Sequence, residues 1–248
     1  MAKHRAVVIG AGRIGAGYQW ADLEYTHAGA YQALRDRVEL VGFIEPNEER
    51  AQSAKLRWHV PVYENIPIGI GALKPDVVSV CVQPEQQQRI FNQLFSGSGD
   101  GIEGVWCEKP FTVKDSCDRG ISCLTMGTPI QVNYLRRGDT FHRGFLDDIG
   151  RPRRLVVYGK DDIHTRCHFE DLAKWWQASL DFRPFNGPCA YVLEYTAYDE
   201  TYFFDNGGLR RPGDAMKAML GNLLDHIDNG TPLWSPPYDN EKEVHIEL

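Results

Sequence analysis

The sequence lacks the features that mark membrane, secreted and nucleic-acid-binding proteins. No apolar run approaches the roughly 18 residues of a membrane span. The first apolar run, residues 6–9, is shorter than the roughly 7–15 residues of a signal-peptide core. Basic residues number 27 against 34 acidic ones, a net charge of −7 that disfavours nucleic acid as a partner. We therefore expect a cytoplasmic protein that binds neither membranes nor nucleic acids.

Cysteine usage also excludes some classes. The six cysteines include no C-x-x-C pair, and several stand inside apolar runs, as Cys81 and Cys107 do. In a protein without secretory features this pattern favours buried, reduced thiols over disulfides or a thiolate metal site.

The first half of the chain alternates strand-like and helix-like segments. Apolar strand-like runs are expected over residues 6–9, 38–44, 75–82, 104–108 and 129–134, and helical patterns over residues 26–37, 46–56 and 84–95. This alternation predicts βαβ units and a parallel sheet covered on both faces. We predict an α/β fold in which residues 1–134 form a doubly wound, Rossmann dinucleotide-binding domain.

The second half has longer strand-like runs rich in aromatic and β-branched residues, over residues 153–158, 189–195 and 200–204. A helix is expected over residues 214–228, ended by Asn229 and Gly230. We predict a smaller α+β domain over residues 135–248 with an open, mainly antiparallel sheet. An exposed sheet of this composition favours a homo-oligomer.

A glycine-rich loop follows the first strand. In G-A-G-R-I-G, Gly10 permits a tight turn, Gly12 lets a pyrophosphate approach the backbone, and Gly15 lets helix and strand pack closely. Arg13 and Ile14 lie in the same loop, at the start of the helix. The alternative is an ordinary strand-to-helix turn.

Glu45 directly follows the second strand. A carboxylate there accepts hydrogen bonds from the adenosine ribose and repels a 2′-phosphate, so NAD is favoured over NADP. Its separation from Gly15 exceeds the usual spacing of about 20 residues, which implies an extended first crossover. The alternative for Glu45 is a solvated loop acid.

Glu108, Lys109 and Pro110 end a later strand, at the edge where doubly wound folds bind ligands. Lys109 can bind a substrate hydroxyl and, with a lowered pKa, take part in proton transfer. A cis peptide bond before the proline is one way to fix this turn.

With these motifs the sequence resembles the glucose–fructose oxidoreductase / inositol dehydrogenase (Gfo/Idh/MocA) family. The likeness is carried in order by the glycine loop, F-I-E-P at residues 43–46, V-C-V-Q-P at 80–84, E-K-P at 108–110 and H-F-E-D-L at 168–172. It covers roughly residues 5–175, and more loosely the chain to about residue 235.

The resemblance implies hydride transfer between a nicotinamide and a hydroxyl-bearing carbon, usually of a sugar or cyclitol. It also implies a second domain whose open sheet helps to assemble oligomers. Carried over, Lys109 binds the reacting hydroxyl and His168 is the acid/base, while Val82, Pro84 and Glu108 lie on the cofactor side. Histidine suits proton transfer because its ordinary pKa is near neutrality.

The chain departs from the family pattern at three points. His164 replaces an aspartate four residues before His168, Gln88 replaces a histidine, and the chain is shorter than usual. We take His164 and Arg136 as candidate substrate contacts. Arg136 belongs to a basic stretch that can bind a phosphorylated or nucleotide-linked sugar through bidentate contacts, or form a solvated surface.

Three other interpretations remain at this point. Residues His164, Cys167, His168 and Asp171 resemble a metal cluster but lack an identifiable third ligand and supporting shell, so we expect no metal. A cofactor-binding regulator or scaffold that has lost catalysis would share the same loop and acid. So would a different Rossmann enzyme, such as a reductase of an imine or a linear intermediate.

Overall fold

The computed structural model describes residues 3–95, 101–113, 125, 127–140, 143, 154–159, 179–184, 191–197, 200–205 and 212–237. For the strands between residues 154 and 205 it describes the backbone. The chain forms two compact units. Met1–Asn133 and Met216–Leu248 make the first, and Tyr134–Ala215 make the second.

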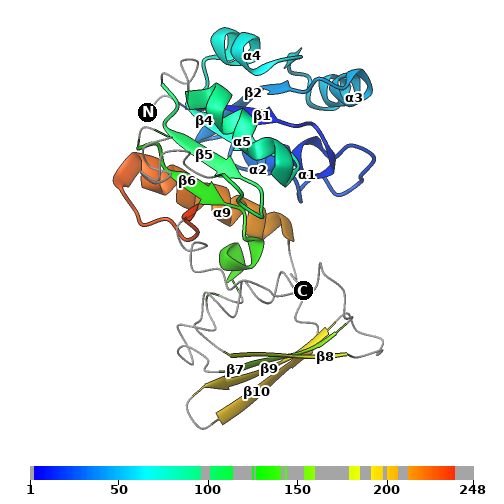
Figure 1. Cartoon of the computed structure of the whole chain (residues 1–248), viewed down its shortest axis with the longest axis vertical. Helices are drawn as coiled ribbons and strands as arrows, with labels where there is room; N and C mark the ends of the chain where they lie inside the picture. The colour runs from blue at the N-terminus through cyan, green and yellow to red at the C-terminus, as the bar shows by residue number, and fades with distance from the viewer. Residues whose placement is uncertain are drawn as a thin grey trace. The chain divides into compact units, whose positions relative to one another are not determined.

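The first unit contains a six-stranded parallel sheet in the order β3-β2-β1-β4-β5-β6 (Figure 1). Its strands are β1 (His4–Ile9), β2 (Val38–Ile44), β3 (Val62–Tyr63), β4 (Val77–Val80), β5 (Gly104–Cys107) and β6 (Ile130–Val132). This is the strand order of a Rossmann fold, in which the chain reverses direction across the sheet between β1 and β4. The predicted doubly wound sheet is confirmed.

Among the described residues, the helices that connect these strands are α1 (Arg13–Ala16), α2 (His27–Ala33), α3 (Glu48–Trp58), α4 (Ile66–Leu73) and α5 (Pro84–Gln93). Side chains of Thr26, Asn47 and Asn65 cap α2, α3 and α4 by accepting a backbone N–H of the first turn. The stretch between α1 and α2 accounts for the long spacing from Gly15 to Glu45, so the extended first crossover is present.

The core lies on both faces of the sheet. Every residue of β4 and β5 is buried, as expected for central strands of a covered parallel sheet. Trp106, Tyr31, Phe43 and Phe91 are among the largest fully buried side chains. The ring planes of Trp106 and Tyr31 are nearly perpendicular, with centroids 6.2 Å apart.

Helix α9 (Pro212–Asn229) covers the β5–β6 side of the sheet from Met216 onward (Figure 1). A Cβ placed on Gly104 would lie 2.7 Å from Cδ1 of Ile227, so the helix packs directly on the β5 backbone. Arg37, just after α2, binds Asp225 and Asp228 of α9. The helix expected over residues 214–228 is therefore present, but it packs against the Rossmann sheet, whereas its position in the sequence placed it with the second domain.

The second unit contains a four-stranded sheet in the order β10-β9-β7-β8. Its strands are β7 (Arg154–Gly159), β8 (Ser179–Pro184), β9 (Tyr191–Ala197) and β10 (Glu200–Asp205). The β7–β9 and β9–β10 pairs are antiparallel, and the β7–β8 pair is parallel. A short 3-10 helix, η2 (Leu135–Gly138), begins this unit. In the described part of the chain, no helix is both long and apolar enough to cross a membrane.

Candidate functional site

The candidate site lies at the carboxyl edge of the parallel sheet. Gly10 follows β1, Glu45 follows β2, Cys81 follows β4, Glu108 follows β5 and Asn133 follows β6. Parallel strands bring all of these positions to one edge, and the reversal between β1 and β4 opens a crevice there in folds of this type. Hydrogen bonds continue the ladder past the strand ends, from Glu108 N–H to Val80 O at 2.9 Å and from Asn133 N–H to Cys107 O at 2.8 Å.

The three glycines of the loop have three different environments. Gly10 has φ +94°, and a Cβ there would lie 2.3 Å from the carbonyl oxygen of Cys81. A Cβ on Gly15 would lie 2.1 Å from the carbonyl oxygen of Gly10, so α1 packs against the end of β1. A Cβ on Gly12 would meet nothing within 4 Å. Two glycines thus form the turn, and the third leaves open space beside the backbone.

Glu45 is buried and bound to the glycine loop. Its Oε2 accepts the N–H of Ala11 at 2.8 Å, and its Oε1 accepts the N–H of Asn47 at 2.9 Å. Only 6% of the residue surface is exposed, so Glu45 is not the solvated loop acid that was its alternative interpretation. The two backbone donors hold the carboxylate in one place, next to the loop and at the end of β2.

The Glu108 carboxylate belongs to a buried polar network. Its Oε1 accepts hydrogen bonds from His27 Nε2 at 2.9 Å and from Asn133 Nδ2 at 2.6 Å. On the other side of the imidazole, His27 Nδ1 lies 2.9 Å from Ser79 Oγ, which lies 2.7 Å from the Tyr31 hydroxyl. The sequence motifs included Glu108 but none of its partners.

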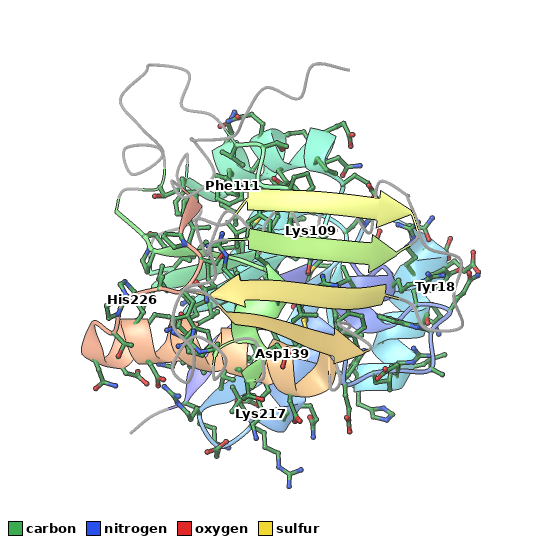
Figure 2. All side chains as sticks on the ribbon, turned by 90° about the horizontal axis from the view of Figure 1, so that it is seen from below. Tyr18, Lys109, Phe111, Asp139, Lys217 and His226 are labelled. Carbon is green, nitrogen blue, oxygen red and sulfur yellow. The ribbon has the colours of Figure 1, made fainter. Side chains whose placement is uncertain are left out.

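The turn after Glu108 is held by Gln87 of α5. Its Nε2 donates to the carbonyl oxygens of Glu108 at 2.9 Å and Pro110 at 3.0 Å, and its Oε1 accepts the N–H of Thr112 at 2.9 Å. The Lys109–Pro110 peptide bond is cis. Lys109, labelled in Figure 2, is partly exposed at the end of β5. The turn therefore presents this amine at the carboxyl edge of the sheet.

Two observations test whether these residues fit a dinucleotide. The space beside Gly12 is open, and any Cβ there would begin to fill it. The N–H groups of the first helical turn have no intrahelical acceptors and can therefore bind an anion. Asn133 Oδ1 is buried, and no described residue donates a hydrogen bond to it. This amide oxygen is an acceptor of the kind that a carboxamide N–H can use. The residues fit such a cofactor.

The other predicted residues are placed as follows. Arg13 is exposed and Ile14 is partly exposed, and both lie in α1 after β1. Val82, on the loop after β4, and Pro84, the first residue of α5, are partly exposed. Arg136 is buried in η2, with 5% of its surface exposed, so the solvated surface that was its alternative is wrong. Arg137 beside it is also buried, with its guanidinium 5.1 Å from the Tyr134 ring centroid. His164 and His168 lie outside the described residues, as do the other members of the supposed metal cluster.

Sequence reasoning missed the histidine, serine, asparagine and glutamine that support Glu108 and the turn. His27 begins α2 directly after the capping Thr26, a position that carries no chemical signature by itself. Asn133 follows β6 as Glu108 follows β5, so a systematic inspection of residues after strands would have found it. No spacing rule predicts that His27 and Glu108 meet.

Burial sets the protonation of three groups near the site. It raises the pKa of the Cys81 and Cys107 thiols well above the ordinary value, with a further contribution from the Glu108 charge. It also raises the pKa of Tyr31, whose hydroxyl stays protonated. Both thiols are free and buried, which confirms the expectation for these two cysteines.

Comparisons with solved structures show a shared fold. Myo-inositol 2-dehydrogenase from Lactobacillus plantarum is 18% identical with a TM-score of 0.69, and the match covers 97% of this chain and 94% of that one. A myo-inositol dehydrogenase from Corynebacterium glutamicum is 16% identical with a TM-score of 0.70, covering 96% and 92%. The WlbA dehydrogenase from Bordetella pertussis, in complex with NADH and UDP-GlcNAcA, is 12% identical with a TM-score of 0.70, covering 96% and 92%. At these identities the likeness is one of fold.

The sequence of the first domain matches a known family model. Among curated proteins, none matches it significantly. Residues 4–119 match the family described as GFO_IDH_MocA, an oxidoreductase family with an NAD-binding Rossmann fold. These residues contain the glycine loop, Glu45 and the Glu108–Pro110 turn described above. The Rossmann domain of this chain is therefore similar to that of the Gfo/Idh/MocA oxidoreductases.

Proposed function

We propose that the protein is an NAD-dependent dehydrogenase or reductase that acts on a secondary alcohol or ketone of a sugar, a nucleotide-linked sugar or a cyclitol. The observation that carries this proposal is the convergence of the glycine loop, Glu45 and Lys109 on one edge of the sheet. The substrate class comes from the names of the structurally similar proteins, which include myo-inositol dehydrogenases and a complex with a nucleotide-linked sugar.

Each residue has a role in this proposal. Gly12 admits the pyrophosphate to the backbone, and Glu45 binds the adenosine ribose and repels a 2′-phosphate. Lys109 binds the reacting hydroxyl, and His168 takes or gives its proton. When bound, the nicotinamide supplies the hydride acceptor or donor. The roles of Arg136 and His164 as substrate contacts, the assembly of a homo-oligomer and the cytoplasmic location remain predictions.

The test uses purified protein and a panel of inositols, sugars and nucleotide-linked sugars, with NADH formation followed by its absorbance. Lys109→Ala is compared with Lys217→Ala, a matched removal of an exposed lysine on α9 (Figure 2). We expect Lys109→Ala to lower kcat at least about 100-fold, the low end for loss of a proton-transfer group, while NADH still binds. Lys217→Ala should retain full activity.

Other results would reject parts of the proposal. Full activity of Lys109→Ala would remove Lys109 from the reaction. Failure of the wild-type protein to bind NADH would reject the cofactor assignment. Tight binding of NADH with no turnover on any substrate of the panel would favour the regulator or scaffold.

A further inference from the structure

The imidazole of His27 is a fully buried polar group that the proposed reaction does not use. It is held from three directions: by Ser79 Oγ at 2.9 Å, by Glu108 Oε1 at 2.9 Å and by the Trp106 ring system, whose centroid is 3.8 Å from its own. His27 and Ser79 are 0% exposed, as is Trp106. Burial of an imidazole costs little free energy when both ring nitrogens have hydrogen-bond partners. Removal of one partner would leave a buried polar group unsatisfied, which costs much more.

The local sequence fixes where this imidazole lies. Thr26 Oγ1 accepts the N–H of Gly29 at 2.9 Å and donates to the carbonyl oxygen of Leu23 at 2.7 Å, so α2 begins at His27. A Cβ on Gly29 would lie 2.0 Å from that same carbonyl oxygen. The stretch before α2 is thus locked onto the first turn of the helix, and the helix presents His27 to β4 and β5.

The hydrogens of this chain of contacts can be assigned from the partners. An ionised carboxylate only accepts, so Nε2 of His27 carries the hydrogen that points to Glu108. Where the imidazole is neutral, its Nδ1 accepts from Ser79, and Ser79 accepts from the Tyr31 hydroxyl. Each of these hydroxyls then donates one hydrogen bond along the chain, which runs from Tyr31 to Glu108.

The far end of the chain is closed. The Tyr31 hydroxyl is completely buried, and Ser79 is its only hydrogen-bond partner among the described residues. The path therefore offers no exit to solvent along which a proton could travel. An ordered chain that ends in the core can orient Glu108, but it cannot carry protons to or from the crevice.

We infer that His27 is a positioning residue: it fixes the Glu108 carboxylate and, with it, the Glu108-Lys109-Pro110 turn at the nicotinamide end of the site. The inference rests on the proposed function for the identity of that end. Glu108 directly precedes Lys109, and only Asn133 shares the task of holding its carboxylate among the described residues. Loss of the imidazole leaves one tether on Oε1 where there were two.

The test compares three variants. His27→Phe keeps an aromatic ring against Trp106 but removes both hydrogen bonds, whereas His27→Gln keeps an N–H donor. Tyr31→Phe is the matched control, because it cuts the same chain at its far end and leaves the His27–Glu108 contact in place. Thermal unfolding of all three shows whether they fold.

We expect His27→Phe to lower kcat about 10- to 100-fold, as second contacts to site residues often do. The Kd for NADH should stay within about threefold, because the adenosine end is untouched. His27→Gln should restore most of kcat, and Tyr31→Phe should lower the melting temperature without changing kcat. The emission of bound NADH should change in His27→Phe only. Equal loss of kcat in His27→Phe and Tyr31→Phe, or unchanged kcat and emission in His27→Phe, would overturn the inference.

Two readouts separate this inference from the proposed function. The ¹⁵N shifts of His27 should report hydrogen on Nε2, and rapid tautomer exchange would overturn the positioning role whether or not the protein turns over substrate. If the protein binds NADH without turnover, the proposed reaction fails while the emission of bound NADH still decides the role of His27. If NADH does not bind, both are rejected.

Discussion

Gly15 and the carbonyl oxygen of Gly10 are in such close contact that a Cβ on Gly15 would lie 2.1 Å from that oxygen. No pair of non-bonded atoms of these types approaches so closely, so the loop requires a residue without a side chain at position 15. Gly12, three residues earlier, has no such neighbour. Gly15 is therefore required for the packing of the fold, whereas Gly12 leaves open space beside the loop.

This difference gives the first prediction. Gly15→Ala should lower the free energy of unfolding by about 1–3 kcal/mol, the usual cost of overpacking, and abolish binding of NADH. Gly12→Ala should fold with a loss below about 1 kcal/mol, yet weaken NADH binding at least about tenfold, which is 1.4 kcal/mol. Urea unfolding and fluorescence titration measure the two effects.

Gly71→Ala is the control for the glycine series. Gly71 is an exposed residue of α4, and a Cβ there would meet nothing within 4 Å. Alanine in a helix is favoured over glycine by about 0.5–1 kcal/mol, so this variant should be slightly more stable and bind NADH normally. Equal NADH affinity in Gly12→Ala and Gly71→Ala would mean that no pyrophosphate lies at Gly12.

The second prediction concerns the choice of cofactor. Glu45→Gln keeps an oxygen for one of the two backbone N–H groups but removes the negative charge that would face a 2′-phosphate. The ratio of NADPH to NADH affinity should rise about tenfold or more, mainly because the repulsion of the extra phosphate is lost. Asp36→Asn, an exposed acid after α2, should leave the ratio unchanged. A ratio unaffected by Glu45→Gln would show that another group sets the preference.

The sequence predicted the parallel sheet well because its central strands are buried on both faces. Segments such as V-V-S-V at residues 77–80 are mostly apolar because both faces are buried, so they are visible as runs in the sequence. The glycine loop was also recognisable from the sequence, because the spacing of its three glycines is a known pattern after a first strand. Glu45 directly follows β2 and Lys109 lies two residues after β5, and the rule that parallel strands end at one edge placed both residues there.

Side-chain contacts between residues far apart in the sequence could not be predicted from the sequence pattern. His27 binds Glu108, and Gln131 binds Asn222, through contacts that depend on helix orientation and strand register and leave no periodicity in the sequence. The prediction that the helix over residues 214–228 belongs to the second domain was wrong for the same reason. Its apolar face predicts burial, but only the fold decides that Ile227 covers Gly104.

The third prediction follows from the lowered pKa of Asp228. Although partial burial opposes it, hydrogen bonds from His4 and Arg37 to this carboxylate lower its pKa below the ordinary value. A carboxylate with a lowered pKa stabilises the fold above its unfolded pKa of about 4, and this contribution is lost as the pH falls through the folded value. The side chain is 24% exposed, so the contribution should be about 0.5–1 kcal/mol.

Asp228→Asn should therefore lower the free energy of unfolding by that amount at pH 7 and by almost nothing at pH 2–3. Urea midpoints at the two pH values measure the difference. Asp36→Asn again serves as the control, because it removes an exposed charge outside this cluster. A loss of stability that is the same at both pH values would mean that Asp228 acts through packing, without an ionic contribution.

The last prediction tests the packing of α9 on the Rossmann sheet. Asn222 is buried, with Oδ1 accepting from Gln131 Nε2 at 3.0 Å and from Trp234 N–H at 2.9 Å. Its Nδ2 donates to the carbonyl oxygen of Pro232 at 3.0 Å. Asn222→Leu would leave the amide of the buried Gln131 without this acceptor, and an unsatisfied buried group costs about 1–3 kcal/mol. It would also remove the hydrogen bonds to Trp234 and Pro232. The variant should unfold at clearly lower urea concentration, and NADH binding should weaken with it.

Lys217→Ala on the exposed side of the same helix should do neither. Hydrogen exchange adds a local readout, because the Val132 N–H of β6 donates to Ser235 O, in the segment that Asn222 holds. In Asn222→Leu this amide should exchange faster than the amides of β1, which lie outside the segment that Asn222 holds. Uniform exchange across the sheet would instead mean that the helix and the edge strand open only when the whole unit unfolds, and that Asn222 adds global rather than local stability.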